Sequence, residues 1–411
     1  MIEPQLDTDI SERIQAVAGM ELVETTMGDG FKFHVFTYEQ PVDHRDPAQG
    51  TFRQRFTMAH RSATRPTVFL TSGYYVGTQP RRVELAELID GNQVALEHRF
   101  FTPSRPDPAD WSKLTIWQAA SDQHRLFHAL KPIYRKNWLA TGGSKGGMTA
   151  TYYARFYSHD MDGVVAYGSP NHLPESRDVA TDRFFARTGT PEHRAALIAV
   201  QREALLRWDE MMAHFNTWAQ EKGHTFDIAG NAEIAFEGLV RDMAWRFWQN
   251  KTINDPIPVT TASSEELFAF IDAAAGWDNF TDERLMFFEP YYVAAGLDLG
   301  FPSYTTPHLD GLLRHPSTYG PRHRVRRDIP LNFAPEAMRD IDRWVRENGR
   351  RLMFVYGEND PWGAEPFRIG PGSVDSYVYV ARDGNHASTI ASLDEDDKAA
   401  ATATARRWAG L

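Results

Sequence analysis

Residues 137–157 read NWLATGGSKGGMTATYYARFY, and they are the strongest indication of the fold. A short apolar strand at 138–140 leads into the glycine-rich set Gly142–Gly146, and a helical pattern follows. Glycines on either side of a serine between a strand and a helix form the nucleophile-elbow pattern, in which the serine occupies a tight turn. Small neighbours are needed there because the backbone passes close to adjacent strands. The stretch predicts Ser144 as a nucleophile; a glycine-rich turn at a sheet edge is the alternative that this pattern alone leaves open.

Two further polar residues follow strand-like segments later in the chain. One apolar segment ends in GENDPW, which puts Asp360 just past it, and the last apolar segment leads through ARDGNHAS to His386. α/β-Hydrolases carry their serine, acid and histidine in this chain order, each at the end of a core strand. A serine hydroxyl is a poor nucleophile at neutral pH, so an imidazole must take its proton and a carboxylate must orient the imidazole.

We therefore predict a catalytic triad of Ser144 as nucleophile, His386 as general base and Asp360 as the orienting acid. Asp360 precedes a proline and could instead only begin a turn, and His386 could be an ordinary loop histidine. Asp383 is a nearby competitor for the acid role.

Apolar segments alternate with helical patterns on both sides of the serine. The segments expected to form strands are 31–40, 51–60, 67–71, 92–97, 138–140, 163–167, 351–356 and 374–380. Such alternation favours a mainly parallel sheet with helices on both faces, entered through an antiparallel pair. Between 171 and 330 the pattern changes to long aromatic-rich helical stretches at 204–218, 232–248 and 264–274. We predict an α/β-hydrolase fold with a core of residues 1–170 and 331–411 and an inserted helical cap of residues 171–330.

An oxyanion hole in such a fold uses two backbone donors. One is the N–H that follows the nucleophile, here that of Lys145, and the other comes from the loop after an early core strand. Gly73 and Tyr74 in TSGYYVG are the candidates for the second donor. Backbone donors do not depend on side-chain identity, so this prediction rests on position, and an ordinary β-turn is the alternative.

Composition narrows the possible functions. The formal net charge of −11 disfavours nucleic acid, which requires clustered Lys and Arg. The absence of cysteine excludes disulfides, thiolate metal sites and a cysteine nucleophile. No H-E-x-x-H motif and no close His/Asp/Glu cluster repeated at ligand spacing was found, so neither a metal nor a cofactor is predicted. No apolar run approaches the ~20 residues that span a bilayer, and the polar start MIEPQLDTDISER is unlike a signal peptide, so we expect no membrane association.

The chain resembles the secreted bacterial prolyl tripeptidyl and tetrapeptidyl aminopeptidases, which are serine peptidases with an α/β-hydrolase core. The resembling segments are YEQPVDHRDP, TFRQRFT, RPTVFLTSGY, DGNQVALEHRFFTPSRP, DWSKLTIWQAASDQHRLFHALKP, NWLATGGSKGGMTATYYARFY, FVYGENDPWGAEPFRIG and GNHAS. The resemblance implies that Ser144, Asp360 and His386 are the triad, and that the substrates are peptides cut a few residues from a free N-terminus, preferably after proline. It also implies secretion, although the chain lacks the signal peptide and the cysteines that members usually have; a cytoplasmic location is the alternative.

Substrate recognition would draw on the cap. Proline before the scissile bond needs a small apolar slot, and the aromatic residues Trp245, Trp248, Tyr291 and Tyr292 are candidates for its walls, with packing inside the cap as the alternative. A free N-terminus needs a carboxylate, because a buried ammonium without a partner is costly. Glu97 is a possible anchor, and a structural salt bridge to an arginine is its alternative.

Two other functions remain open at this point. A carboxylester hydrolase could use the same triad, and a silent hydrolase-fold binding protein could retain the fold without turnover. The presence of all three triad residue types disfavours the binding protein. The oligomeric state is not predicted.

Overall fold

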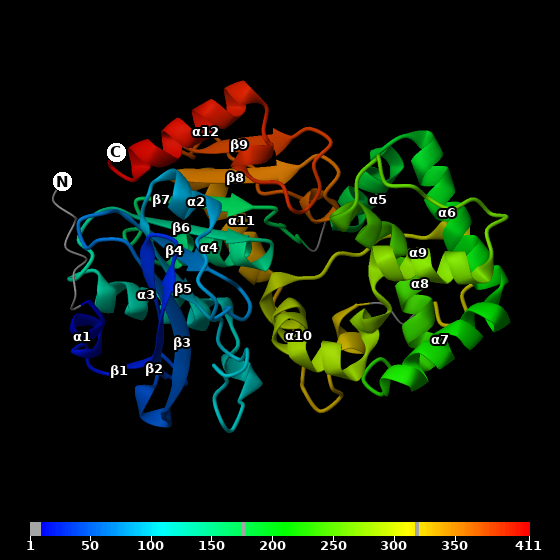
Figure 1. The fold of residues 1–411 in the computed structure, drawn as a ribbon, viewed down its shortest axis with the longest axis horizontal. Coiled ribbons are helices and arrows are strands. Elements are labelled where there is room, and N and C mark those ends of the chain that lie inside the picture. The colour runs from blue at the N-terminus through cyan, green and yellow to red at the C-terminus, as the bar shows by residue number, and fades with distance from the viewer. Residues whose placement is uncertain (1–9, 174–176, 317–319) are drawn as a thin grey trace.

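A computed structural model describes residues 10–173, 177–316 and 320–411. In this part of the chain, nine strands form one mixed sheet (Figure 1). The strands are β1 Met20–Gly28, β2 Phe31–Pro41, β3 Thr51–His60, β4 Thr67–Thr71, β5 Asn92–Leu96, β6 Trp138–Gly143, β7 Gly163–Tyr167, β8 Leu352–Gly357 and β9 Tyr377–Ala381. The α-helices are α1 Ile10–Gln15, α2 Glu84–Leu88, α3 Ile116–Leu130, α4 Lys145–Phe156, α5 Arg177–Arg187, α6 Pro191–Leu206, α7 Trp208–Lys222, α8 Ala232–Asn250, α9 Ser264–Ala275, α10 Asp282–Ala294, α11 Glu336–Asn348 and α12 Glu395–Trp408.

The strand order is β1-β2-β3-β5-β4-β6-β7-β8-β9. Strands β1, β2, β3 and β5 pair in antiparallel fashion, and the pairs from β5 through β4 to β9 are parallel. The carboxyl ends of the parallel strands therefore meet at one edge of the sheet. This order, with helices on both faces, is the predicted α/β-hydrolase architecture.

Side chains alternate between the two faces of the sheet, as the period of a strand requires. Within β6, Trp138 and Ala140 join a cluster with residues of α3 and α4, whereas Leu139 points to the opposite face and packs with residues of α2 and α12. Both faces are thus covered by helices, which is why the central strands are apolar on both sides.

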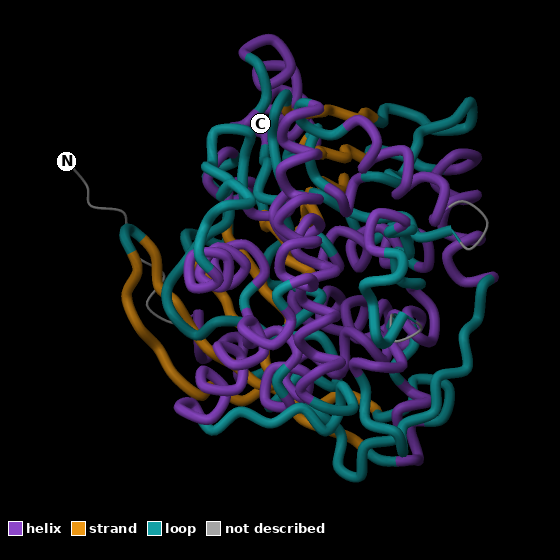
Figure 2. The backbone as a smooth tube through the Cα atoms, turned by 90° about the vertical axis from the view of Figure 1, so that its right-hand side faces the viewer, coloured by secondary structure: helices purple, strands orange, loops and turns teal. Residues whose placement is uncertain are grey.

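The segment 171–330 holds helices α5 to α10 and lies beside the carboxyl edge of the sheet, and we refer to it as the cap (Figure 1). From the cap side, its helices lie in front of many of the strands (Figure 2). The cap has a core of its own, in which Trp277 stacks on Phe236 at 5.6 Å and on Phe268 at 4.7 Å between ring centroids. None of the described helices is both long and apolar enough to cross a membrane.

Among the differences from expectation, one concerns a strand and one concerns a cap helix. Strand β1 was not predicted, because it is an edge strand whose side chains are mostly exposed, so it carries no clear apolar alternation. The helix expected at 204–218 is two helices, α6 and α7, which meet at Arg207. The guanidinium of Arg207 donates to the carbonyls of Thr260 and Ala262, so a tertiary contact holds the break.

Candidate active site

Ser144 lies between β6 and α4 with φ +57° and ψ −127°, a conformation that L-residues rarely adopt. Its N–H donates to the carbonyl of Tyr167 at 2.8 Å, which ties the turn to the neighbouring strand β7. A Cβ on Gly146 would lie 2.6 Å from the carbonyl oxygen of Thr71, and a Cβ on Gly142 would collide with Gly146. The glycines are therefore required by close backbone approach, as expected for a nucleophile elbow.

Asp360 and His386 meet beyond the carboxyl ends of β8 and β9. The His386 Nδ1 lies 2.8 Å from Asp360 Oδ2, and the carboxylate is 1% exposed. A carboxylate only accepts, so Nδ1 carries the proton and Nε2 is left to accept one. The other carboxylate oxygen accepts from the N–H of Trp362 at 2.9 Å, which fixes its orientation. Gly168 makes room for the pair, since a Cβ there would lie 3.1 Å from His386 Nδ1.

Ser144 and His386 line one cavity, and Asp360 supports His386 from behind it. The competing acid, Asp383, is exposed and does not line this cavity. Among the described residues, the geometry therefore favours Asp360 over Asp383 for the acid role.

Tyr74 is one of the two candidates for the second oxyanion donor, and its backbone N–H already has a partner. The N–H of Tyr74 donates to Ser72 Oγ at 3.1 Å, so it is engaged within its own turn. The phenol of Tyr74 instead lies close to the Ser144 side chain and to the backbone N–H of Lys145. Burial is the main cause that raises the pKa of Tyr74 to about 12, so the phenol stays protonated at neutral pH. The side chain of Tyr74 therefore lies beside the elbow.

Gly73 and Lys145 hold the loop that carries Tyr74 against the elbow. A Cβ on Gly73 would lie 2.6 Å from the backbone nitrogen of Gly146, so the loop passes directly beside the start of α4. The buried side-chain nitrogen of Lys145 donates to the Gly73 carbonyl at 2.6 Å and lies 5.7 Å from the Tyr74 ring centroid. Burial lowers the pKa of Lys145 well below its usual range.

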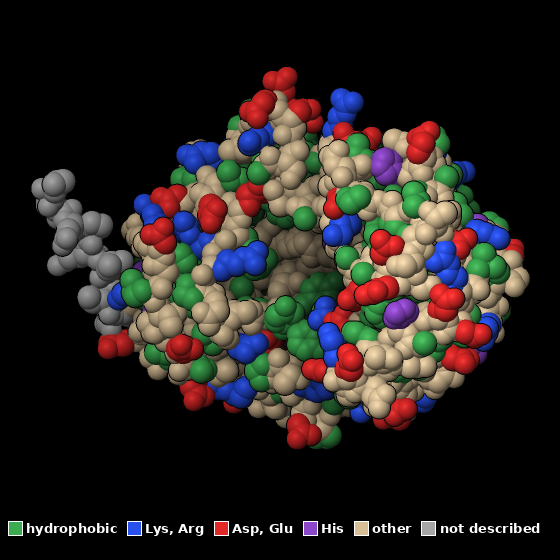
Figure 3. Space-filling model, turned by 45° about the vertical axis from the view of Figure 1, so that its right-hand side comes forward, with side chains coloured by type: hydrophobic (Ala, Val, Ile, Leu, Met, Phe, Trp, Pro, Cys, Tyr) green, Lys and Arg blue, Asp and Glu red, His purple; other side chains and the backbone are tan. Residues whose placement is uncertain are grey.

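The core and the cap both line the cavity. Figure 3 shows a hollow between the two lobes with hydrophobic side chains inside it. Helix α8 contributes Asp242, Trp245, Arg246 and Gln249, whose spacing of three and four residues places them on one helical face. Helix α10 contributes a similar face, made up of Arg284, Phe288, Tyr291 and Tyr292.

Two residues predicted to bind substrate lie elsewhere. Trp248 lies on another face of α8 and is packed beneath Gly189, where a Cβ would collide with its ring. Glu97 is buried outside the cavity, where its carboxylate accepts from Arg55, from Ser104 and from the N–H of Val76. Glu97 therefore forms the structural salt bridge that was its alternative role. Trp248 is packed within the cap, which was its own alternative.

Asp242 is the one carboxylate among the described residues that line the cavity. It accepts from Arg324 at 2.8 Å and from the Tyr304 hydroxyl at 3.1 Å. Asp242, Arg246, Arg284 and Arg324 were not predicted from the sequence. The periodicity of α8 around Trp245 was the signal that could have identified Asp242 and Arg246.

The model of the family described as PS-10 peptidase S37 matches residues 2–411. The chain belongs to this family. This S37 peptidase is 54% identical over 407 residues to the prolyl tri/tetrapeptidyl aminopeptidase of Streptomyces mobaraensis, covering 98% of this chain and 85% of that protein. Membership makes the protein a serine peptidase, as the resemblance implied.

Two more distant similarities complete the comparison. The lysosomal Pro-X carboxypeptidase of Mus musculus is 29% identical to the S37 peptidase over 161 residues, which cover 34% of this chain and 32% of that protein. The crystal structure of a proline iminopeptidase from Mycobacterium smegmatis covers 91% of this chain and 98% of its own, with 14% identity and a TM-score of 0.41.

Proposed function

We propose that this S37 peptidase releases tripeptides and tetrapeptides from free N-termini, preferably after proline, through an acyl-enzyme on Ser144. The observation that carries the proposal is the 54% identity to a prolyl tri/tetrapeptidyl aminopeptidase over nearly the whole chain. The cavity supports this proposal, because Ser144 and His386 both line it and its walls are rich in aromatic side chains. Asp360 is hydrogen-bonded to His386.

In the proposed mechanism, His386 Nε2 takes the proton of the Ser144 hydroxyl as the serine oxygen attacks the carbonyl carbon before the scissile bond. Asp360 keeps the imidazole in the tautomer with its proton on Nδ1 and stabilises the imidazolium that forms. The imidazolium then gives the proton to the leaving amine as the C–N bond breaks. A water molecule, activated by the same imidazole, hydrolyses the ester and releases the short peptide.

The proposed oxyanion hole pairs the N–H of Lys145 with the O–H of Tyr74. Both groups lie beside Ser144, so an oxyanion held between them would accept from both. The raised pKa suits Tyr74 to this role, because a phenolate could not donate. Gly73 would then serve to bring the loop close to the elbow, with no need for the N–H of Tyr74.

The proposed proline slot lies against Trp245 and Trp362. Their rings meet edge to face at 5.0 Å between centroids, and the Trp362 ring lies 6.0 Å from that of His386. The Trp362 ring is apolar and close to His386, so it could pack against the proline of the substrate that precedes the scissile bond. Tyr291 and Tyr292 line the same cavity from α10 and would complete its walls.

The proposed anchor for the substrate N-terminus is Asp242. Its carboxylate lies in the cavity and already forms charge-assisted contacts, so it is held in place for a second cation. An ammonium at Asp242 would fix the distance from the N-terminus to Ser144, which limits the length of the released peptide.

The test compares an Ala-Ala-Pro amide carrying a free N-terminus with the same amide after acetylation. We expect rapid cleavage of the free amide and a large loss of kcat/KM on acetylation. Equal rates would refute the aminopeptidase proposal. Turnover of short acyl esters without any amide cleavage would favour a carboxylester hydrolase instead.

We also propose that the protein acts outside the cytoplasm, on the strength of its family resemblance alone. Peptidase activity against the Ala-Ala-Pro amide in the culture medium of the source organism tests this proposal. Activity confined to the cell lysate would contradict it.

A further inference from the structure

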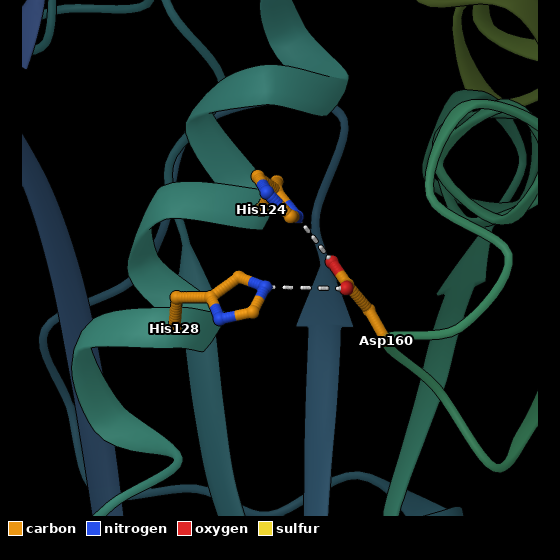
Figure 4. Close-up of side chains that lie close together, drawn as sticks. All are labelled: His124, His128 and Asp160. Atoms are coloured by element: carbon orange, nitrogen blue, oxygen red, sulfur yellow. Dashed lines mark hydrogen bonds and ion pairs between the residues drawn. The ribbon is translucent and has the colours of Figure 1, made fainter.

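His124, His128 and Asp160 come together at the surface of the core (Figure 4). None of them lines the cavity of Ser144. The two histidines are one turn apart on α3, and Asp160 lies in the turn between α4 and β7. The His124 Nδ1 is 2.8 Å from Asp160 Oδ2, and the His128 Nε2 is 3.5 Å from Asp160 Oδ1. One ligand atom from each residue lies within 4.8 Å of the other two.

We propose that these three side chains bind a divalent transition metal ion, with Zn²⁺ as the best match. Two imidazole nitrogens and one carboxylate oxygen suit Zn²⁺, whereas Ca²⁺ and Mg²⁺ prefer oxygen ligands. Bonds of about 2.0–2.2 Å to a tetrahedral ion place ligand atoms roughly 3.3 Å apart. The two histidine nitrogens face different oxygens of the Asp160 carboxylate, at 2.8 Å and 3.5 Å, and the candidate ligand atoms all lie within 4.8 Å of one another, so side-chain rotations would bring them to this spacing.

Neighbouring side chains hold two of the three ligands in place. The Tyr153 hydroxyl donates to Asp160 Oδ2 at 2.7 Å, and the aspartate side chain is 7% exposed. The His124 ring stacks on the Tyr157 ring with centroids 4.0 Å apart, and the Tyr157 hydroxyl is hydrogen-bonded to the Ser121 hydroxyl. Such supporting contacts orient metal ligands and tune their affinity.

The third ligand, His128, lies on the side of the site that is open to solvent. The His128 side chain is 60% exposed, so it can rotate toward the ion, and solvent can supply a fourth ligand. The metal would then bridge α3 and the turn before β7, two segments that are separated in the sequence.

The topology assigns this ion a structural role. Ser144 follows the carboxyl end of β6, whereas Asp160 lies just before the amino end of β7. Helix α4 separates the two residues and, with twelve residues, is about 18 Å long. The ion would therefore stabilise the core without contacting the substrate. The H-x-x-x-H spacing on α3 was visible in the sequence, but the aspartate 32 positions after His128 becomes a neighbour only through folding.

The test is Zn²⁺ titration of the full chain after chelator treatment, by calorimetry and by thermal unfolding. We expect one high-affinity equivalent and a rise in Tm. His128→Asn should weaken Zn²⁺ binding at least about tenfold, because the loss of a residue that only supports a metal ligand already lowers metal affinity by about that much. The same variant should abolish the rise in Tm. Asp160→Asn should do the same, and peptidase activity of His128→Asn should be unchanged, since His128 is exposed and remote from Ser144.

The matched control is His214→Asn, which removes an exposed histidine of the cap that belongs to no such cluster among the described residues. It should bind Zn²⁺ as the wild type does. Absence of binding to the wild type, or identical binding by the wild type and by both the His128 and Asp160 variants, would overturn the proposal. Binding that depends on His128 but leaves Tm unchanged would overturn the structural role.

Discussion

The core rim and the cap line the same cavity, but their side chains arrive there by different physical routes. On the rim, Ser144, Asp360 and His386 each follow the end of a parallel strand, and parallel strands bring their carboxyl ends to one edge. On the cap, the lining residues are single faces of α8 and α10, whose orientation depends on packing against other cap helices. In the proposed function, the rim performs the reaction and the cap selects the substrate.

Removing the proposed nucleophile tests the role of the rim most severely. Ser144→Ala should reduce kcat for an Ala-Ala-Pro amide by about 10⁴- to 10⁶-fold, because the serine and histidine of a triad act as a unit. Labelling by a fluorophosphonate probe should disappear together with the activity, while Tm stays close to that of the wild type. A labelled Ser144→Ala protein would show that another residue is the nucleophile.

Exchanging the acid tests which carboxylate orients His386. Asp360→Asn should reduce kcat by about 10⁴-fold, because the amide favours the wrong imidazole tautomer. Asp383→Asn is the matched control and should retain the wild-type rate, since Asp383 is exposed outside the cavity. Similar losses in the two variants would contradict the assignment of Asp360.

The Tyr74 phenol lies where the rim adjoins the cap. Tyr74→Phe keeps the ring but removes the proposed donor, so kcat should fall by about 10²- to 10³-fold while KM changes little. The neighbouring Tyr75 is an exposed residue whose ring packs against Phe287, and Tyr75→Phe should have little effect. A rise in KM alone would indicate that Tyr74 binds substrate and does not stabilise the oxyanion.

The smallest expected effect concerns selectivity and lies in the cap. Asp242→Asn should lower the preference for the free over the acetylated amide by about 10- to 100-fold, the amount expected for one hydrogen bond to a charged group. The ratio of the rates for the free and the acetylated amide, both measured on the same variant, corrects for any loss of folded protein.

Glu97→Gln is the counterpart of Asp242→Asn on the core side. It should leave the preference for a free N-terminus unchanged while lowering the free energy of unfolding by about 1–3 kcal/mol, because a buried network of hydrogen bonds is weakened. Denaturant titration and the same pair of amides measure the two effects. If Glu97→Gln and not Asp242→Asn removes the preference, the anchor lies on the core side.

Several elements predicted from the sequence agree with the structure, because their formation depends on short stretches of chain. The central strands and most helices follow from apolar periodicity, and the glycines around Ser144 follow from the space available in a tight turn. Periodicity could not identify β1, an exposed edge strand, or the break at Arg207, which is held by carbonyls more than fifty residues away.

The sequence by itself determined which reactive groups the protein contains, their order along the chain and the sheet that carries them, because these depend on residue type and local spacing. Only the tertiary structure decided that the phenol of Tyr74 reaches the elbow, that Glu97 is bound by Arg55 and Ser104, and that Asp160 faces two histidines of α3. The reason is that each of these roles depends on a partner brought close by folding, and the direction of a side chain toward such a partner is not encoded in its neighbours along the chain.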